Sequence, residues 1–273
     1  MEIFDIHAHI YPYKIADKAV KSIGAFYNHS MFGDGTAEML VNSGKDAGIT
    51  KYFVHSAATV KMQVPNINDF IKSECDKNKK LIGFGTLHPD MDEEETEKEV
   101  EKMISYGFKG IKLHPDFQKF FIDEVKAFKM YEIIGGRLPI LFHTGDNRED
   151  YSSPERVVKM LCNFKNQQVI AAHFGAYTVW EKAEYYETVL KNHEIKDNLY
   201  FDTSSSIMYL SKEKVKELIN EYGSERFFFG SDYPMWSPDK EFERFTGLDL
   251  RDCDNENILS KNFIRFFGTD ILK

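Results

Sequence analysis

Seven of the nine histidines in this chain fall at or just beyond the end of a short apolar segment rich in β-branched or aromatic residues. His7 and His9 are separated by a single residue, whereas His143 and His173 follow later segments and Asp232 follows the last one. Neutral imidazoles together with one carboxylate form a donor set for a borderline cation such as Zn²⁺. The residue types therefore predict a metal site, on the condition that the fold brings them together.

The apolar segments recur at a regular spacing, which indicates the elements that carry the histidines. After the first segment, they end at residues 55, 87, 114, 143, 173, 202 and 231, so that consecutive ends lie 27 to 32 residues apart. About 30 residues accommodate a β-strand, a crossover helix and two short loops. Segments that are apolar on both faces suit buried parallel strands. We expect eight strands, at residues 3–7, 52–55, 82–87, 110–114, 139–143, 169–173, 199–202 and 227–231.

The residues between these segments read as amphipathic helices. Apolar residues recur at helical spacing in 157–164, behind Ser153 and Pro154, and again in 215–222, between Ser211 and Gly223. The acidic run 92–101 suits the first turns of a helix, where the helix dipole favours carboxylates. Eight strands alternating with helices predict an α/β fold, a single (β/α)₈ barrel. An open doubly wound sheet is the alternative, but the first strand lacks a Gly-rich phosphate loop.

The spacing between the first two apolar segments is longer than the others, because their ends, His7 and His55, are 48 positions apart. We interpret the excess, about Tyr11 to Gly35, as a segment inserted after the first strand. Loops that follow barrel strands form the active-site face, so this aromatic-rich segment is expected to be a lid or a wall of the pocket. The alternative is an ordinary amphipathic helix packed outside the barrel.

Composition excludes several other classes of protein. The 35 Lys and Arg residues against 44 Asp and Glu residues give a net charge of −9, which disfavours a broad surface for nucleic acid. Three widely spaced cysteines fit a reducing compartment, and acidic residues interrupt the stretch where a signal peptide would be apolar. No apolar run is long enough for a membrane span. We expect a soluble cytoplasmic protein with one domain over residues 1–273, and we leave open a homodimer.

Six motifs, spread in order from Ile3 to Gly268, read FDIHAHIYP, GFKGIKLHP, ILFHTGD, VIAAHFG, FFFGSDYP and NILSKNFIRFFG. With these motifs the sequence resembles the amidohydrolase-related branch of the metal-dependent amidohydrolase superfamily. That resemblance implies a TIM barrel and a small-molecule substrate. It also implies that a single Zn²⁺ is held by His7, His9, His143 and Asp232. His173 is then expected to stand beside the water on the metal, with a longer fifth contact to the metal as a further option.

This arrangement predicts a catalytic role for Asp232 and His173. Zn²⁺ lowers the pKa of a bound water and polarises a substrate carbonyl. Hydroxide then attacks the carbonyl carbon, while Asp232 accepts the water's proton and later delivers it to the leaving group. His173 orients the hydroxide or stabilises the developing oxyanion. A purely structural role for Asp232, as a cap ahead of Pro234, is the alternative.

Three residues are candidates for substrate binding. Lys112 shares a strand face with His114, so its ammonium is expected to hold a carboxylate or oxyanion of the substrate. A carboxylated Lys112 bridging a second metal ion is the less favoured reading, and a lysine that simply reaches solvent is another. His114 is interpreted either as a substrate contact or as a hydrogen-bonding residue of its loop. Arg148 is a weaker candidate for binding an anion. His55 and His88 receive no role.

Three functions are compared on these residues. The first is a metal-dependent hydrolase acting on a small, acidic amide, ester or lactone through Zn-activated water. The second keeps the metal but is a decarboxylase of a small unsaturated or aromatic acid, and the donor set suits both reactions. The third is a TatD-like deoxyribonuclease, which is disfavoured because the middle strands end in TLHPD and IKLHP, without the glutamates that hold its second metal.

Overall fold

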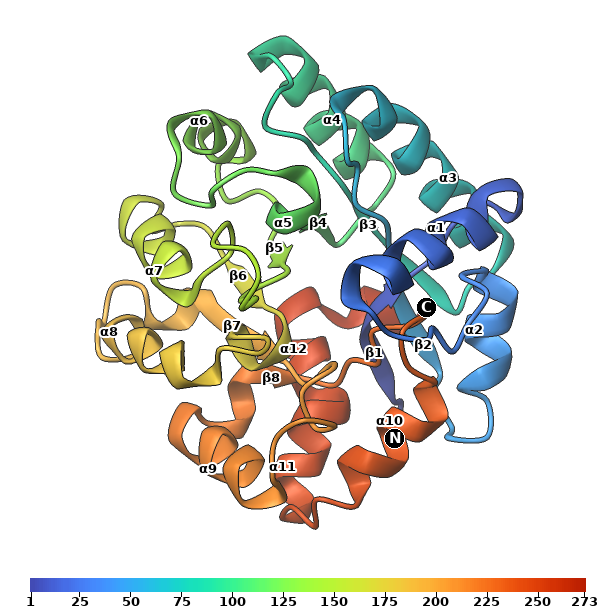
Figure 1. Ribbon diagram of the computed structural model, residues 1–273, viewed down its shortest axis with the longest axis vertical. Helices are drawn as coiled ribbons and strands as arrows, with labels where there is room; N and C mark the ends of the chain where they lie inside the picture. Colours follow the sequence, from blue (N-terminus) through green and yellow to red (C-terminus); the bar gives the residue numbers. More distant parts are fainter. The chain divides into compact units, whose positions relative to one another are not determined.

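The computed structural model describes residues 1–273, and Figure 1 shows its elements coloured along the chain. Strands alternate with helices, as the sequence predicts. The strands are β1 (Phe4–His9), β2 (Lys51–His55), β3 (Leu81–Gly85), β4 (Gly110–Leu113), β5 (Ile140–Phe142), β6 (Val169–Ala171), β7 (Leu199–Asp202) and β8 (Phe227–Phe228). They belong to one sheet, in which hydrogen-bonded neighbours run in the order β1 to β8. The carbonyl of Phe229, directly after β8, accepts a hydrogen bond from the amide of Ile6 in β1 at 2.9 Å. The predicted (β/α)₈ barrel is confirmed.

The helices follow the strands along the chain. They are α1 (Tyr13–Tyr27), α2 (Ala37–Ser43), α3 (Val64–Lys77), α4 (Glu93–Ser105), α5 (Pro115–Gln118), α6 (Val125–Ile134), α7 (Pro154–Asn163), α8 (Tyr186–Leu190), α9 (Lys212–Tyr222), α10 (Pro238–Thr246), α11 (Asp252–Glu256) and α12 (Asn262–Phe267). The acidic run lies in the first turns of α4, where Asp92 and Glu95 form a reciprocal capping box. Ser211 caps α9 by accepting a hydrogen bond from the amide of Lys214. None of these helices combines the length and apolarity that a bilayer crossing requires.

The ends of six strands differ from the sequence-based prediction, by one to three residues. β1 continues past His7 to His9, because the amide of His9 donates to the carbonyl of Tyr233 at 2.7 Å and prolongs the pairing. β3 ends at Gly85 and β8 at Phe228, earlier than expected. Beyond β8 the backbone enters a left-handed conformation at Asp232 (φ 58°), which is incompatible with a continuing strand.

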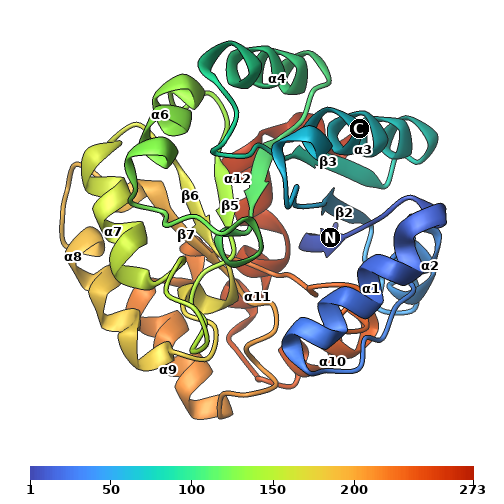
Figure 2. The same cartoon turned by 45° about the horizontal axis from the view of Figure 1, so that its top comes forward.

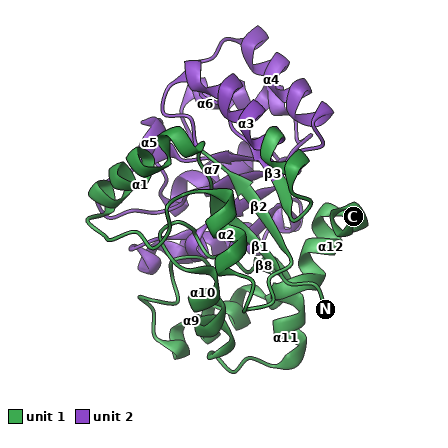
Figure 3. Ribbon diagram, turned by 90° about the vertical axis from the view of Figure 1, so that its right-hand side faces the viewer, with its two compact units in different colours: residues 1–56, 73–82, 203–273 green, residues 57–72, 83–202 purple.

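The chain divides into two compact units, drawn in separate colours in Figure 3. Unit 1 comprises residues 1–56, 73–82 and 203–273, and unit 2 comprises residues 57–72 and 83–202. The expectation of a single domain stays a prediction. In unit 1, aromatic rings from both ends of the chain pack together: Phe4 stacks on Phe263 with centroids 4.9 Å apart, and Phe53 and Phe228 also contact Phe263. This cluster anchors β1, the strand that carries His7 and His9.

Unit 2 has its own apolar core. The buried ring of Tyr131 in α6 contacts Phe142 of β5 edge to face, with centroids 6.0 Å apart, and also contacts Phe164. Helix α4 packs against α6 and α7 against α8, as Figure 2 shows. These contacts hold the strands that end at the candidate residues of this unit.

Helix α1 occupies most of the segment predicted as an insertion. Together with residues 29–39 it borders a cavity of about 810 Å³ within unit 1. The buried phenol of Tyr233 ties this segment to the loop after β8, because its hydroxyl accepts a hydrogen bond from the amide of Gly35 at 3.1 Å and donates to the carbonyl of Thr36 at 3.0 Å. Only glycine fits at position 33, since a Cβ there would lie 2.3 Å from the Tyr233 ring. A role for this segment as a wall of the active site stays a prediction.

Candidate metal centre

Unit 1 brings three of the predicted metal ligands together at the end of β1. The Nε2 atoms of His7 and His9 lie 3.2 Å apart, and Oδ1 of Asp232 lies 3.5 Å from the first and 3.7 Å from the second. Ligands bound tetrahedrally at 2.0–2.1 Å are separated by about 3.3 Å. Three donors spaced in this way, two of them imidazoles of side chains that are at most 11% exposed, fit a divalent metal ion.

The backbone around these donors is held by a buried carboxylate that the sequence did not single out. Oδ1 of Asp5 accepts hydrogen bonds from the amide of His7 at 3.0 Å and from the amide of Ser231 at 2.9 Å, while its other oxygen accepts from the Ser231 hydroxyl. The amide of Asp232 in turn donates to the carbonyl of His7 at 2.8 Å. Asp5 thereby connects β1 to the segment that presents Asp232.

Hydroxyl groups from the loop after β7 contact His7 and Asp232 at the side-chain atoms that do not face each other. Ser204 Oγ lies 3.1 Å from Nδ1 of His7, and Ser205 donates its hydroxyl proton to Oδ2 of Asp232. The indole nitrogen of Trp236 donates to Ser205 Oγ at 2.9 Å. Such partners orient metal ligands and determine which nitrogen of an imidazole faces the ion. Here they leave His7 Nε2 and Asp232 Oδ1 directed toward each other.

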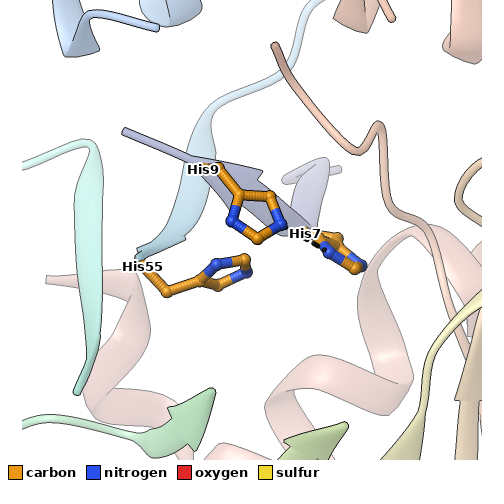
Figure 4. Close-up of side chains that lie close together, drawn as sticks. All are labelled: His7, His9 and His55. Carbon is orange, nitrogen blue, oxygen red and sulfur yellow. Dashed lines mark hydrogen bonds between the residues drawn. The ribbon is translucent and has the colours of Figure 1, made fainter. Parts of the chain in front are cut away.

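His55, which the sequence analysis left without a role, lies beside this pair. It ends β2, and the parallel register places its Cα opposite that of His9. Figure 4 shows the rings of His7, His9 and His55 gathered around one point, with all three side chains buried. Their potential ligand atoms lie within 4.8 Å of one another. The signal in the sequence was present, because His55 also ends a predicted strand.

Unit 2 brings together the two remaining histidines of the predicted site. Nδ1 of His143, directly after β5, lies 3.0 Å from Nε2 of His173, two residues after the end of β6. The amide of His173 donates to Oδ1 of the buried Asp202 at 2.9 Å. His173 also has a left-handed backbone (φ 61°), as does Asp232 in unit 1. Non-glycine residues in this conformation carry strain and concentrate at functional sites.

A buried carboxyl contacts the far side of His143. Oδ2 of Asp116 lies 3.5 Å from Nε2 of His143 and accepts a hydrogen bond from the Ser152 hydroxyl at 2.8 Å. Burial raises the pKa of Asp116 to about 7, the negative charge of Asp146 adds to that rise, and the Ser152 hydrogen bond opposes it. The sequence analysis missed Asp116, which follows the strand-end motif by two residues.

The predicted substrate-binding residues lie in unit 2 in different surroundings. Lys112 is fully buried in β4, which rules out the reading of a lysine that reaches solvent. The ring of His114 stacks between Phe117 and His143, with centroids 3.8 Å and 4.0 Å away, and its Nδ1 accepts from the Phe117 amide at 3.4 Å. The guanidinium of Arg148 forms a salt bridge with Asp146. Substrate contact by these three residues stays a prediction.

Comparisons with known proteins agree with this fold. Among solved structures, an uncharacterised TIM-barrel protein from Bordetella bronchiseptica superposes with a TM-score of 0.78 at 16% sequence identity, covering 97% of this chain and 98% of that one. The 2,6-dihydroxybenzoate decarboxylase from Rhizobium is similar with a TM-score of 0.72 at 14% identity, covering 99% of both chains.

A dihydroxybenzoic acid decarboxylase from Polaromonas, with bound manganese and the inhibitor 2-nitroresorcinol, reaches a TM-score of 0.72 at 16% identity, covering 98% of this chain and 97% of that one. Among curated proteins, none matches the sequence. The amidohydrolase family model matches residues 4–269, which include every strand and every candidate residue described above. The chain therefore belongs to the amidohydrolase family.

Proposed function

We propose that the protein is a divalent-metal-dependent decarboxylase of a small aromatic or unsaturated carboxylic acid. The observation that carries the metal dependence is the triangle of donor atoms from His7, His9 and Asp232, whose edges of 3.2, 3.5 and 3.7 Å suit one ion. We propose His143 as the fourth ligand, because strand ends in a (β/α)₈ barrel converge on one face. His173 is proposed to act beside the ion.

The buried ammonium of Lys112 complements a substrate carboxylate, which the acidic substrates of both reactions carry. One consideration supports decarboxylation over the hydrolysis that the sequence analysis favoured. Solved structures with the same fold include several decarboxylases of hydroxylated aromatic acids. Hydrolysis of a small acidic amide, ester or lactone is the second candidate, because the family match is to amidohydrolases.

The residues have defined tasks in either reaction. A bound divalent ion supplies Lewis acidity, which draws electron density from a coordinated substrate oxygen and lowers the pKa of a coordinated water. In decarboxylation the bond to the carboxylate carbon breaks, its electron pair stays on the substrate carbon, and Asp232 or His173 delivers a proton to that carbon. In hydrolysis Asp232 accepts a proton from water and passes it to the leaving group.

The identity of the metal forms part of the proposal. An imidazole-rich donor set suits Zn²⁺, as the sequence analysis expected, whereas carboxylates and waters suit Mn²⁺. The Polaromonas decarboxylase contains manganese, so both ions belong in the assay. We propose that Zn²⁺ binds more tightly and that a single ion binds per chain.

A metal analysis combined with a substrate screen tests this function. Purified protein is stripped with a chelator, reloaded with Zn²⁺ or Mn²⁺, and assayed with hydroxylated benzoic acids, unsaturated diacids, lactones and amides. Release of CO₂ from an acid supports the first candidate, and hydrolysis without CO₂ supports the second. Replacement of His7 and His9 together by Ala is expected to abolish metal binding and activity while the protein stays folded. Full metal occupancy in that double variant would contradict the assignment.

A further inference from the structure

We propose that His55 is an additional ligand of the metal ion bound at His7 and His9, so that this centre contains one imidazole more than the ligand set inferred from the sequence. The inference deepens the proposed function and rests on it, because it assigns a further residue to the same metal. Nothing in the sequence analysis assigned His55 a role.

The separations between the three rings carry this inference. With metal–nitrogen bonds of about 2.1 Å, the centroid of a bound imidazole lies about 3.2 Å from the ion. Two such rings are then about 4.5 Å apart at a right angle and about 5.2 Å apart at a tetrahedral angle. The observed centroid distances are 5.1 Å for His7 and His9, 5.1 Å for His7 and His55, and 4.5 Å for His9 and His55. Each pair falls within the range expected for rings that share one ion.

The rings of this cluster are also inclined to one another. The plane of His55 is inclined by 64° to that of His7 and by 88° to that of His9. His143 and His173, whose ring nitrogens lie 3.0 Å apart, are inclined by a similar 65°, whereas His114 and His143 stack face to face at 7°. Figure 4 shows the three rings close together and inclined to one another, and one potential ligand atom of each residue lies within 4.8 Å of those of the other two.

The backbone holds His55 in this position before any metal binds. Its carbonyl accepts a hydrogen bond from the amide of Ile10 at 3.0 Å, and the hydroxyl of the next residue, Ser56, donates to the carbonyl of Ile10. The end of β2 is therefore fastened to Ile10, directly after β1, both at His55 and at the residue that follows it. Because His55 is also completely buried, little side-chain entropy remains to be lost on metal binding.

An additional imidazole has a consequence for the choice of metal. Imidazole favours Zn²⁺, Co²⁺ and Ni²⁺ over Mn²⁺, which prefers oxygen ligands. We therefore expect His55 to increase the preference of this centre for Zn²⁺ over Mn²⁺. A residue that only packed against His9 would affect the affinities for both ions equally.

The experiment replaces His55 by Phe, which keeps an aromatic ring in the cluster and removes both nitrogen donors. The matched control is His88→Phe, because His88 is also a buried histidine that follows a strand, three residues after the end of β3, with Nδ1 accepting from the amide of Asp90 at 3.2 Å. Zn²⁺ and Mn²⁺ affinities are measured on metal-stripped protein by competition with a chelator. His55→Phe is expected to weaken Zn²⁺ binding by at least about tenfold and Mn²⁺ binding by less, while the control keeps both affinities.

A second measurement uses the unmodified protein and does not depend on how the variant folds. In the Co²⁺-loaded wild type, each coordinated imidazole gives a hyperfine-shifted N–H proton signal. We expect one signal for each of His7, His9, His143 and His55. A wild type that binds the metal but shows no signal from His55, or an unchanged Zn²⁺ affinity in a folded His55→Phe, would overturn this inference alone. A wild type that binds no divalent metal would instead overturn the proposed function.

Discussion

Oδ2 of Asp116 lies 3.5 Å from Nε2 of His143, on the side of the ring opposite to the nitrogen that approaches His173. The Ser152 hydroxyl donates a hydrogen bond of 2.8 Å to the same oxygen. This contact favours the tautomer of His143 that carries its proton on Nε2, so that the Nδ1 lone pair faces Nε2 of His173, 3.0 Å away. A carboxylate behind a histidine ligand fixes its tautomer and orientation.

Removing this oxygen is therefore expected to disturb His143. Asp116→Leu is predicted to lower metal affinity by about tenfold and to convert the single tautomer of His143 into a mixture. The ¹⁵N chemical shifts of the imidazole nitrogens in metal-free protein report the tautomer directly. Asp116→Asn keeps a carbonyl oxygen in this place and is expected to restore most of the affinity. A pure Nε2–H tautomer in the Leu variant would show that Asp116 has no such role.

Ser205 is predicted to position Asp232. Its hydroxyl donates to Oδ2 of Asp232, while Trp236 supplies a hydrogen bond to the same hydroxyl, so the serine orients the carboxylate and keeps Oδ1 toward His7. Ser205→Ala should lower metal affinity by about tenfold, as loss of an outer-shell partner does, and chelator competition measures this loss.

The matched control for that variant is Ser206→Ala, because Ser206 is equally buried but donates only to the backbone carbonyl of Ser204 at 3.1 Å. Its metal affinity should equal that of the wild type. Equal losses in both serine variants would mean that the loop as a whole, and not the Ser205 hydroxyl, supports the metal centre.

Lys112 is predicted to bind an acidic group of the substrate. Lys112→Ala should mainly raise KM, with a smaller fall in kcat, if the ammonium acts equally on the ground and transition states. Lys112→Arg should recover part of the loss because a cation remains, although its geometry differs. Metal content should stay at a single ion per chain in both variants. A wild type that holds a second ion and loses it in Lys112→Ala would identify a carboxylated lysine instead.

Glu241 in α10 makes the stability of the protein depend on pH. Burial raises the pKa of its side chain to about 7, against the partial compensation by Arg244, so the native state retains a proton that the unfolded state releases at lower pH. The free energy of unfolding should therefore fall between about pH 4.5 and pH 7, by at most about 1.4 kcal/mol per pH unit from this group.

The variant Glu241→Gln removes this titration, so its unfolding free energy should fall less steeply over this pH range, where the buried Asp116, whose pKa is also raised to about 7, still contributes. Denaturant unfolding at a series of pH values measures the effect. The control is Glu243→Gln, because Glu243 lies on the same helix but pairs with Lys240 at the surface. If both variants keep the slope of the wild type, Glu241 does not retain a proton in the native state.

The pattern of the sequence alone was enough to predict the alternation of strands and helices and, to within three residues, where each strand ends. Both features depend on local sequence. Buried parallel strands need continuous apolar segments, and crossover helices need a roughly fixed length of chain, so the apolar segments recur at a regular spacing. Because functional side chains of a barrel follow its strands, His7, His9, His143 and His173 could be picked out by position. His55 also ends a predicted strand, but its position in the sequence could not show whether it is a metal ligand or a histidine that only packs against its neighbours.

The tertiary structure decided which of these side chains meet and how each is oriented. His55 lies beside His9 because of the register between β1 and β2, and Asp232 approaches His7 because Asp5 bonds to Ser231, which is 226 residues away in the chain. Asp116 and Ser205 act through contacts with side chains at distant positions, and no spacing in the sequence records such contacts. Strand identity follows from local apolar periodicity, whereas register and side-chain orientation depend on long-range packing and hydrogen bonds, which exist only in the folded chain.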